Sequence, residues 1–122
     1  METEKFSPLL FAKDLGEWRA WLDKNCQTAT LIYVVVYHKS SPKESVHWHE
    51  VIEHALCFGW VDSIAHKRDG ESCYLKFSPR KPKSQWGKRN IERAKKMIDS
   101  GQMRPPGQAL IDLAKSQGKW PG

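Results

Sequence analysis

The sequence predicts an α+β domain, in which a small antiparallel sheet of about three strands packs with about four helices in the order α-β-α-β-β-α-α. Three observations predict this class. Residues 29–37 are rich in β-branched and aromatic side chains, which favour a strand. Residues 60–78 contain two strand-like segments on either side of an Asp-Gly pair, which is typical of a hairpin. Residues 48–56 place apolar side chains at helical spacing. A length of 122 residues indicates one domain, residues 1–122.

The first helix is predicted to begin at the capping box Asp14-Leu-Gly-Glu17, where an acidic cap and a Glu three residues later satisfy free backbone N–H groups. The side chains expected on its buried side are those of Trp18, Trp21 and Leu22. Residues 29–37 (ATLIYVVVY) follow as a strand that is apolar on both faces, so we expect it to be covered on both sides or central in the sheet.

A polar loop over residues 38–45 leads to the second predicted helix, which is strongly amphipathic. Its apolar positions recur at i, i+3, i+4, i+7 and i+8, and they are Trp48, Val51, Ile52, Ala55 and Leu56. Gly59 is placed to end this helix. The hairpin strands, roughly 60–67 and 72–78, follow. We expect a two-residue turn at Asp69-Gly70 in which both residues have positive φ.

Ser84 is the predicted N-cap of a third helix that reaches about Ser100 and closes at Gly101. Its predicted buried side chains are Ile91, Ala94 and Ile98. Pro105-Pro106-Gly107 then begins a last helix, since Pro is favoured in the first turn. Its predicted inward side chains are Leu110, Leu113 and Ala114.

Positive charge is concentrated in one window. Residues 79–96 contain eight Lys or Arg and one acid, a net charge of +7, whereas the whole chain carries +6. A helix beginning at Ser84 would direct free N–H groups and the positive end of its dipole into this window. We therefore predict an anion-binding site at Arg80, Lys81, Lys83, Ser84, Lys88 and Arg89. The alternative is a solvated basic surface in which Arg80 pairs with Asp62 or Asp69.

Aromatic and polar side chains near this window are predicted to form the walls of the site. They are Trp60, Asp62, Phe77, Trp86 and Asn90. Asp62 follows Trp60 by two, so both side chains point to one side of their strand. Trp60, Tyr74, Phe77 and Trp86 could also stack bases beside a basic track, which makes a nucleic-acid-binding module an alternative function. Core packing is the competing interpretation for at least two of these four rings.

The composition excludes several other classes. The longest apolar run, residues 31–37, is far shorter than the ~20 residues of a membrane helix. Three cysteines without a CxxC pair argue against a disulfide framework and for reduced thiols. The N-terminus lacks an apolar leader and a cleavage site, so we expect a cytoplasmic chain.

The segment HWHEVIEH (47–54) contains possible metal ligands. His49 and His54 are five residues apart and diverge by roughly 140° on a straight helix, so they cannot share one metal. We expect neither a metal nor a cofactor. A small enzyme with a site near His54, Cys57 and Asp62 remains a further alternative, although Cys57 between Leu56 and Phe58 is expected to be a structural thiol.

Four segments together resemble one protein family. They are ALCFGWVD (55–62), FSPRKPKSQW (77–86), Asn90 and GQM (101–103). They are similar to the YdeI/OmpD-associated family, often labelled bacteriocin-protection proteins, over about residues 15–120. The resemblance implies a role in stress and resistance to antimicrobial peptides, and for some members association with an outer-membrane porin. It implies no reaction and no cofactor. The periplasmic location that it implies is not supported by the N-terminal sequence.

The expected function is therefore non-enzymatic recognition of an anionic group by the segment 79–89. A basic chain repels cationic peptides, so the expected partners are acidic, either a phosphate-bearing lipid or an acidic protein surface.

Overall fold

The computed structural model describes residues 6–38 and 46–120, so most of the predicted polar loop lies outside the described residues. These residues form four helices and a four-stranded sheet, which confirms the α+β class. The elements are β1 (Leu9–Leu10), α1 (Leu15–Asn25), β2 (Ile32–Tyr37), α2 (Trp48–Leu56), β3 (Trp60–Lys67), β4 (Ser72–Pro79), α3 (Lys88–Asp99) and α4 (Pro105–Ser116). Within this part of the chain, no helix is both long and apolar enough to cross a membrane.

The sheet has the strand order β1-β2-β4-β3, in which β1 runs parallel to β2 and the other pairs are antiparallel. The sheet is therefore mixed and has one strand more than predicted. The sequence did not reveal β1 because two residues are too few to show a period. The strand predicted over 29–37 begins only at Ile32 and is central, between β1 and β4.

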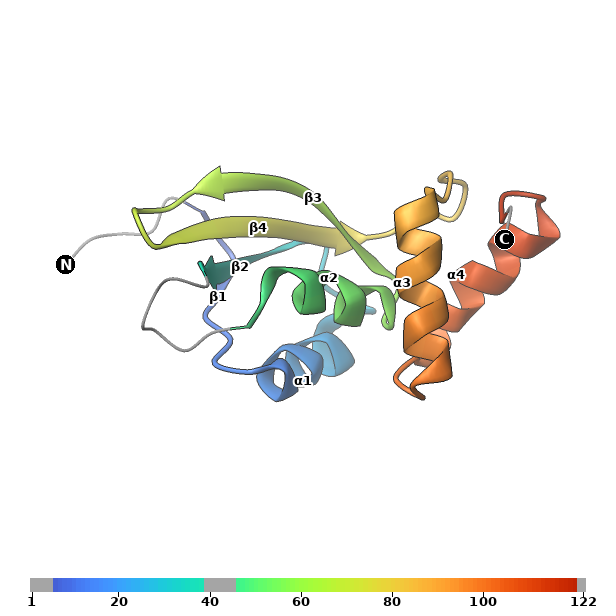
Figure 1. Ribbon diagram of the computed structural model, residues 1–122, viewed down its shortest axis with the longest axis horizontal. Coiled ribbons are helices and arrows are strands. Elements are labelled where there is room, and N and C mark those ends of the chain that lie inside the picture. Colours follow the sequence, from blue (N-terminus) through green and yellow to red (C-terminus); the bar gives the residue numbers. More distant parts are fainter. Residues whose placement is uncertain (1–5, 39–45, 121–122) are drawn as a thin grey trace.

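Helices α1 and α2 pack on one face of the sheet, while α3 and α4 lie beyond one end of it (Figure 1). The apolar side chains form two clusters. The larger cluster joins the sheet to α1 and α2, and the smaller one joins α3 and α4 to the end of α2. The other face of the sheet is not covered by any helix of the described chain.

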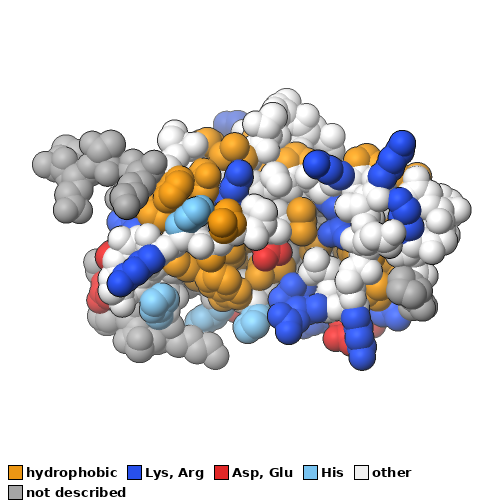
Figure 2. All heavy atoms as spheres, turned by 90° about the horizontal axis from the view of Figure 1, so that it is seen from above, with side chains coloured by type: hydrophobic (Ala, Val, Ile, Leu, Met, Phe, Trp, Pro, Cys, Tyr) orange, Lys and Arg blue, Asp and Glu red, His pale blue; other side chains and the backbone are white. Residues whose placement is uncertain are grey.

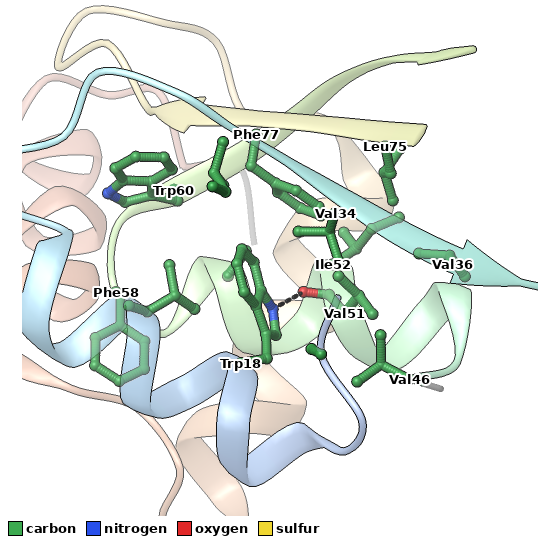
Figure 3. Packing of buried hydrophobic residues seen from close by; sticks show 14 of the residues in the cluster. Trp18, Val34, Val36, Val46, Val51, Ile52, Phe58, Trp60, Leu75 and Phe77 are labelled. Atoms are coloured by element: carbon green, nitrogen blue, oxygen red, sulfur yellow. Dashed lines mark hydrogen bonds between the residues drawn. The ribbon is translucent and has the colours of Figure 1, made fainter. Parts of the chain in front are cut away.

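Trp18 is at the centre of the larger cluster, with 0 % of its surface exposed. Its indole N–H donates to the carbonyl of Val51 at 3.0 Å, so that α1 is tied to α2 through a satisfied polar group (Figure 3). Phe77 lies against it with ring centroids 5.1 Å apart. The predicted burial of Trp18 and Leu22 is confirmed, and Trp21 is partly buried beside them.

The predicted helix ends are confirmed in part. Asp14 caps α1, because its side chain accepts a hydrogen bond from the Glu17 amide at 2.9 Å. Gly59 and Gly101 both have positive φ after α2 and α3. In α2, the predicted apolar face is buried except for Trp48, which is 38 % exposed because it is the first residue of the helix.

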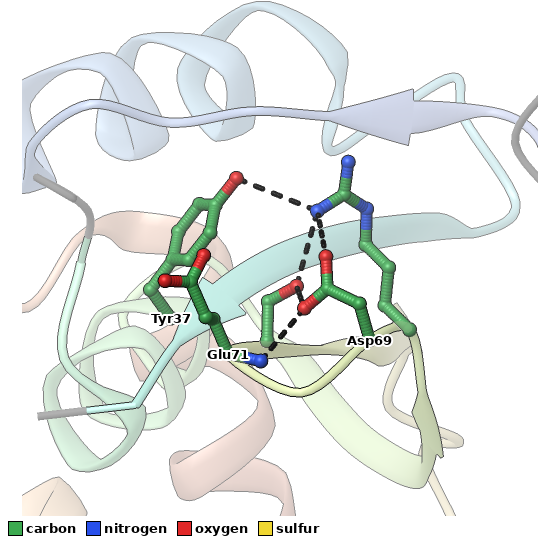
Figure 4. Close-up of polar contacts among 5 residues, drawn as sticks. Tyr37, Asp69 and Glu71 are labelled. Atoms are coloured by element: carbon green, nitrogen blue, oxygen red, sulfur yellow. Dashed lines mark hydrogen bonds and ion pairs between the residues drawn. The ribbon is translucent and has the colours of Figure 1, made fainter. Parts of the chain in front are cut away.

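The hairpin is confirmed, but the predicted two-residue turn is wrong. Four residues, 68–71, connect β3 and β4, and Gly70 does not have positive φ. The Asp69 carboxylate supplies the turn geometry instead, accepting from the Glu71 amide at 2.8 Å and the Ser72 hydroxyl at 2.9 Å. Arg68 joins this group by donating to Asp69, Ser72 and the Tyr37 hydroxyl (Figure 4).

The third helix begins three residues later than predicted. Its N-cap is Gly87, not Ser84. The amide and hydroxyl of Ser84 both donate to the Lys81 carbonyl, and this local turn competes with helix formation. Ile98 is 37 % exposed rather than buried, because Met97 continues the i, i+3 series of Ile91 and Ala94.

The fourth helix begins at Pro105 as predicted, and Ala114 is buried. Leu110 and Leu113 are only partly buried, because the fully buried side chain on this helix is Ile111. Gly107 brings α4 into close contact with the end of α2. A Cβ atom at this position would lie 2.4 Å from the carbonyl oxygen of Leu56 and 2.5 Å from that of Cys57.

We predict that Gly107→Ala destabilises the fold by at least about 2 kcal/mol, since two backbone oxygens cannot move aside cheaply. Helix propensity alone would favour Ala by about 1 kcal/mol. The free energy of unfolding in urea measures the difference. Gly70→Ala is the matched control, because no atom lies within 4 Å of the Cβ it would add. Equal stabilities for the two variants would contradict the close packing.

Candidate anion-binding site at the start of α3

Arg80 follows directly after β4 and turns into the protein. Its backbone N–H donates to the Gly59 carbonyl at 2.8 Å, and only 8 % of the residue is exposed. The guanidinium lies 3.8 Å from the centroid of the Trp86 ring and donates from Nη2 to the Gln85 carbonyl at 2.6 Å. Trp86 is itself buried and packs edge-on against Trp120. The side chain of Arg80 is therefore fixed by stacking and by the loop that follows it.

No carboxylate balances this buried cation among the residues that the structure describes. Asp69, one of the two expected partners, pairs with Arg68 at 3.2 Å, and Asp62 forms no ion pair with Arg80. Nε of Arg80 is buried without a hydrogen-bond partner. Burial lowers the pKa of the guanidinium, because the charged form loses solvation. Burying a charge without a counter-charge costs free energy. An anion bound next to Arg80 would therefore be stabilised.

The N-terminus of α3 supplies a second positive feature. The Gly87 N-cap has no side chain to accept from the first turn, and the first turn contains no acidic residue. The amide of Ile91 bonds to the Gly87 carbonyl, so the helix leaves the amides of residues 88–90 without an intrahelical partner. The helix dipole adds partial positive charge at the same end.

Arg80 and the start of α3 border one hollow of about 380 Å³, which we call the Arg80 hollow. Its lining combines strand, loop and helix residues: Val61, Ser78, Pro79, Arg80, Lys81, Ser84, Gln85, Gly87 and Asn90. Apart from Val61, Pro79 and Gly87, each of these has a polar or charged side chain. The volume is sufficient for a phosphate group together with part of a larger molecule.

The structure brings together some of the predicted binding residues and separates others. Arg80, Lys81 and Ser84 line the hollow. Lys83, Lys88 and Arg89 are exposed and do not line it. The free backbone amides predicted at a helix start next to Ser84 are those of residues 88–90 instead, because the helix begins at Lys88.

Only some of the predicted wall residues lie at the hollow. Asn90 lines the hollow, and its Oδ1 accepts from Arg93 at 2.8 Å. Trp86 supports the Arg80 guanidinium. Trp60 and Phe77 are core residues with at most 1 % exposed surface, so they do not border this hollow. Asp62 lies opposite Phe77 in the strand register and is outside the lining.

Val61, Ser78, Pro79 and Gly87 were not named as site residues from the sequence, and Gln85 was included only through its backbone amide. Val61 and Ser78 could have been found from the predicted hairpin, because they are opposite each other near its open end. Gly87 directly before a Lys-Arg pair was also a signal for an uncapped helix start in a basic segment.

His54 and Cys57, which the alternative enzyme hypothesis used, both contact other groups of the protein. Cys57 is fully buried, its thiol donates to the Glu53 carbonyl at 3.6 Å, and burial raises its pKa. His54 Nδ1 is 2.8 Å from Nη1 of Arg19, which also donates to the Gln102 carbonyl from Nη2. Over residues 6–38 and 46–120, no cluster of three His, Cys, Asp or Glu side chains could hold a metal ion.

Residues 10–110 match a domain family described as a domain of unknown function (DUF8412). The chain belongs to this family. No curated protein and no solved structure matches the chain.

The contact between Arg19 and His54 predicts a pH-dependent stability. Burial and the Arg19 charge lower the pKa of His54 in the folded protein, while an unfolded histidine titrates near ~6.5. The neutral ring therefore stabilises the fold above this pH, and that contribution is lost as the pH falls below it. We predict that the urea midpoint of His54→Gln falls less than that of the parent between pH 7.5 and pH 5.5. Gln keeps an acceptor for Arg19 but does not titrate in this range.

His49→Gln is the matched control, because His49 is an exposed histidine of the same helix. It is expected to leave the pH dependence of the midpoint as in the parent. If the urea midpoint of His54→Gln falls as much as that of the parent, the protonation of His54 is not the cause of the pH-dependent stability.

Proposed function

We propose that this chain is a non-enzymatic binding domain that recognises an anionic group, of the phosphate type, in the Arg80 hollow. The observation that carries the proposal is the buried Arg80 guanidinium, which has no carboxylate partner among the described residues. Proteins rarely bury a charge without compensation. A bound anion would supply the missing compensation.

The groups around the hollow fit an oxyanion better than a spherical ion. Arg80 presents a planar set of N–H donors held in place by the Trp86 ring, and a guanidinium of this kind suits two oxygens of one phosphate. Lys81 adds a point charge, and the free amides of α3 add oriented donors. Each charge-assisted hydrogen bond formed here contributes about 1.5–3 kcal/mol.

The resemblance to the YdeI/OmpD-associated family gives this binding a biological setting. We place it in a cytoplasmic stress response that protects against bacteriocins or other antimicrobial peptides. The charge of +6 argues against direct capture of cationic peptides, because like charges repel. Protection would act through an acidic partner, either a phosphate-bearing molecule or an acidic protein surface.

We predict that Lys81→Glu weakens binding of inorganic phosphate about 10-fold, or ~1.4 kcal/mol, because it replaces a cation on the wall of the hollow with an anion. Lys95→Glu is the matched control. Lys95 is exposed on α3 and is not part of the lining. Isothermal titration calorimetry at about 50 mM salt resolves the difference, since surface fields are weakly screened there.

The control is expected to bind phosphate within about twofold of the parent, because Lys95 lies outside the lining of the hollow, about two helical turns after the start of α3. Equal loss in both variants would mean that phosphate responds only to the overall charge. Absence of saturable binding to the parent would remove the proposed function altogether.

A further inference from the structure

The sheet face opposite α1 and α2, which we call the outer face, carries a cluster of aromatic rings. Phe6 lies over three of them, with centroid distances of 4.7 Å to Tyr33, 4.6 Å to His66 and 5.0 Å to Tyr74. The strand register places Tyr74 opposite His66 and next to the Tyr33–Lys76 pair. These four rings form the aromatic platform of the outer face.

The platform is accessible. Phe6, Tyr33 and His66 are each partly exposed, while Tyr74 is buried beneath them at 3 % exposure. Ile64, in the irregular part of β3, is 51 % exposed. Seen from above, hydrophobic side chains gather on this face, and Lys and Arg side chains gather mostly toward the end where α3 and α4 lie (Figure 2).

The platform and the Arg80 hollow belong to one surface. Side chains alternate along a strand, so Tyr74, Lys76 and Ser78 of β4 all point to the outer face. Ser78 lines the hollow, as does Val61 opposite it. Tyr74 and Ser78 are four residues apart, which is about 13 Å along the strand. A ligand with a planar group on the platform would therefore need only a short span to place an anion near Arg80.

The charge of the outer face favours a polyanion. The paired positions of β2, β3 and β4 that face outward contain Lys76 and His66 and no Asp or Glu. The three acids of the hairpin lie elsewhere. Asp69 and Glu71 are in the distal turn, where Asp69 is tied to Arg68, and Asp62 is opposite Phe77 in the strand register. The paired outward positions therefore present no carboxylate to a phosphate, although Figure 2 shows one acidic side chain near the middle of this view.

We infer that the outer face binds a single-stranded nucleic acid, with a base stacked on Phe6, the ring that lies over the rest of the aromatic platform, and a backbone phosphate in the Arg80 hollow. This inference rests on the proposed function and names the ligand class for the same site. Stacking on exposed rings beside a basic groove is the chemistry by which single strands are held without sequence preference. A duplex offers no free base faces, so it would bind more weakly than a single strand.

Fluorescence anisotropy with a labelled ten-nucleotide oligo(dT) at 50 and 200 mM NaCl tests this inference. We expect affinity to fall with salt, and Phe6→Ala to weaken binding at least about 5-fold, since one stacked base contributes about 1–3 kcal/mol. Trp48→Ala is the matched control, because Trp48 is an exposed aromatic residue on α2, on the helix-covered side. Lys76→Glu provides a second variant that leaves every platform ring in place, and it is also expected to weaken binding.

Phosphate titration of the same variants separates the two proposals. Phe6→Ala should bind inorganic phosphate as the parent does, since the ring is outside the Arg80 hollow. If phosphate binds but oligo(dT) does not, or if Phe6→Ala and Lys76→Glu bind oligo(dT) like Trp48→Ala, the inference is overturned and the phosphate site stands. Preference for phosphatidylglycerol vesicles over oligo(dT) would also overturn it, in favour of a lipid ligand. Loss of phosphate binding in the parent would remove both proposals.

Discussion

The contact between the Arg80 guanidinium and the Trp86 ring is the interaction on which the candidate site depends. It fixes the path of the chain between the last strand and the third helix, because both partners are buried and the guanidinium also binds the Gln85 carbonyl. A desolvated cation–π contact of this kind contributes about 2 kcal/mol or more. Without it, residues 81–87 would lose the wall that shapes the Arg80 hollow, and the start of α3 would no longer face the end of the sheet.

The site also depends on how the two apolar clusters are joined. Arg19 of α1 links His54 of α2 to the Gln102 carbonyl after α3, and Gly107 allows α4 to pack on the end of α2. These contacts place the α3–α4 pair at the end of the sheet. The hollow thus lies where the hairpin meets a helix held by a separate cluster, and such junctions are common positions for ligand sites.

Much of the fold could be predicted from local patterns. The Asp14 cap, the apolar face of α2 and the positive φ of Gly59 follow from spacing and backbone chemistry. The candidate site could be predicted only in part, because charge density indicates an anion but not which cation is buried. Arg80 and Lys81 are adjacent, yet only Arg80 is enclosed by Trp86, and this depends on tertiary packing. The aromatic platform was also beyond reach, since Phe6 meets Tyr33, His66 and Tyr74 through the register of three strands.

The central claim is that the buried Arg80 side chain engages an anion. Proton–nitrogen correlation spectra of the arginine Nε–H groups, recorded during titration with inorganic phosphate, test it most directly. We expect the Arg80 signal to shift saturably, with the same dissociation constant as the backbone amides of residues 88–90. An Arg80 signal that stays in place while exposed arginines such as Arg89 shift linearly would contradict it.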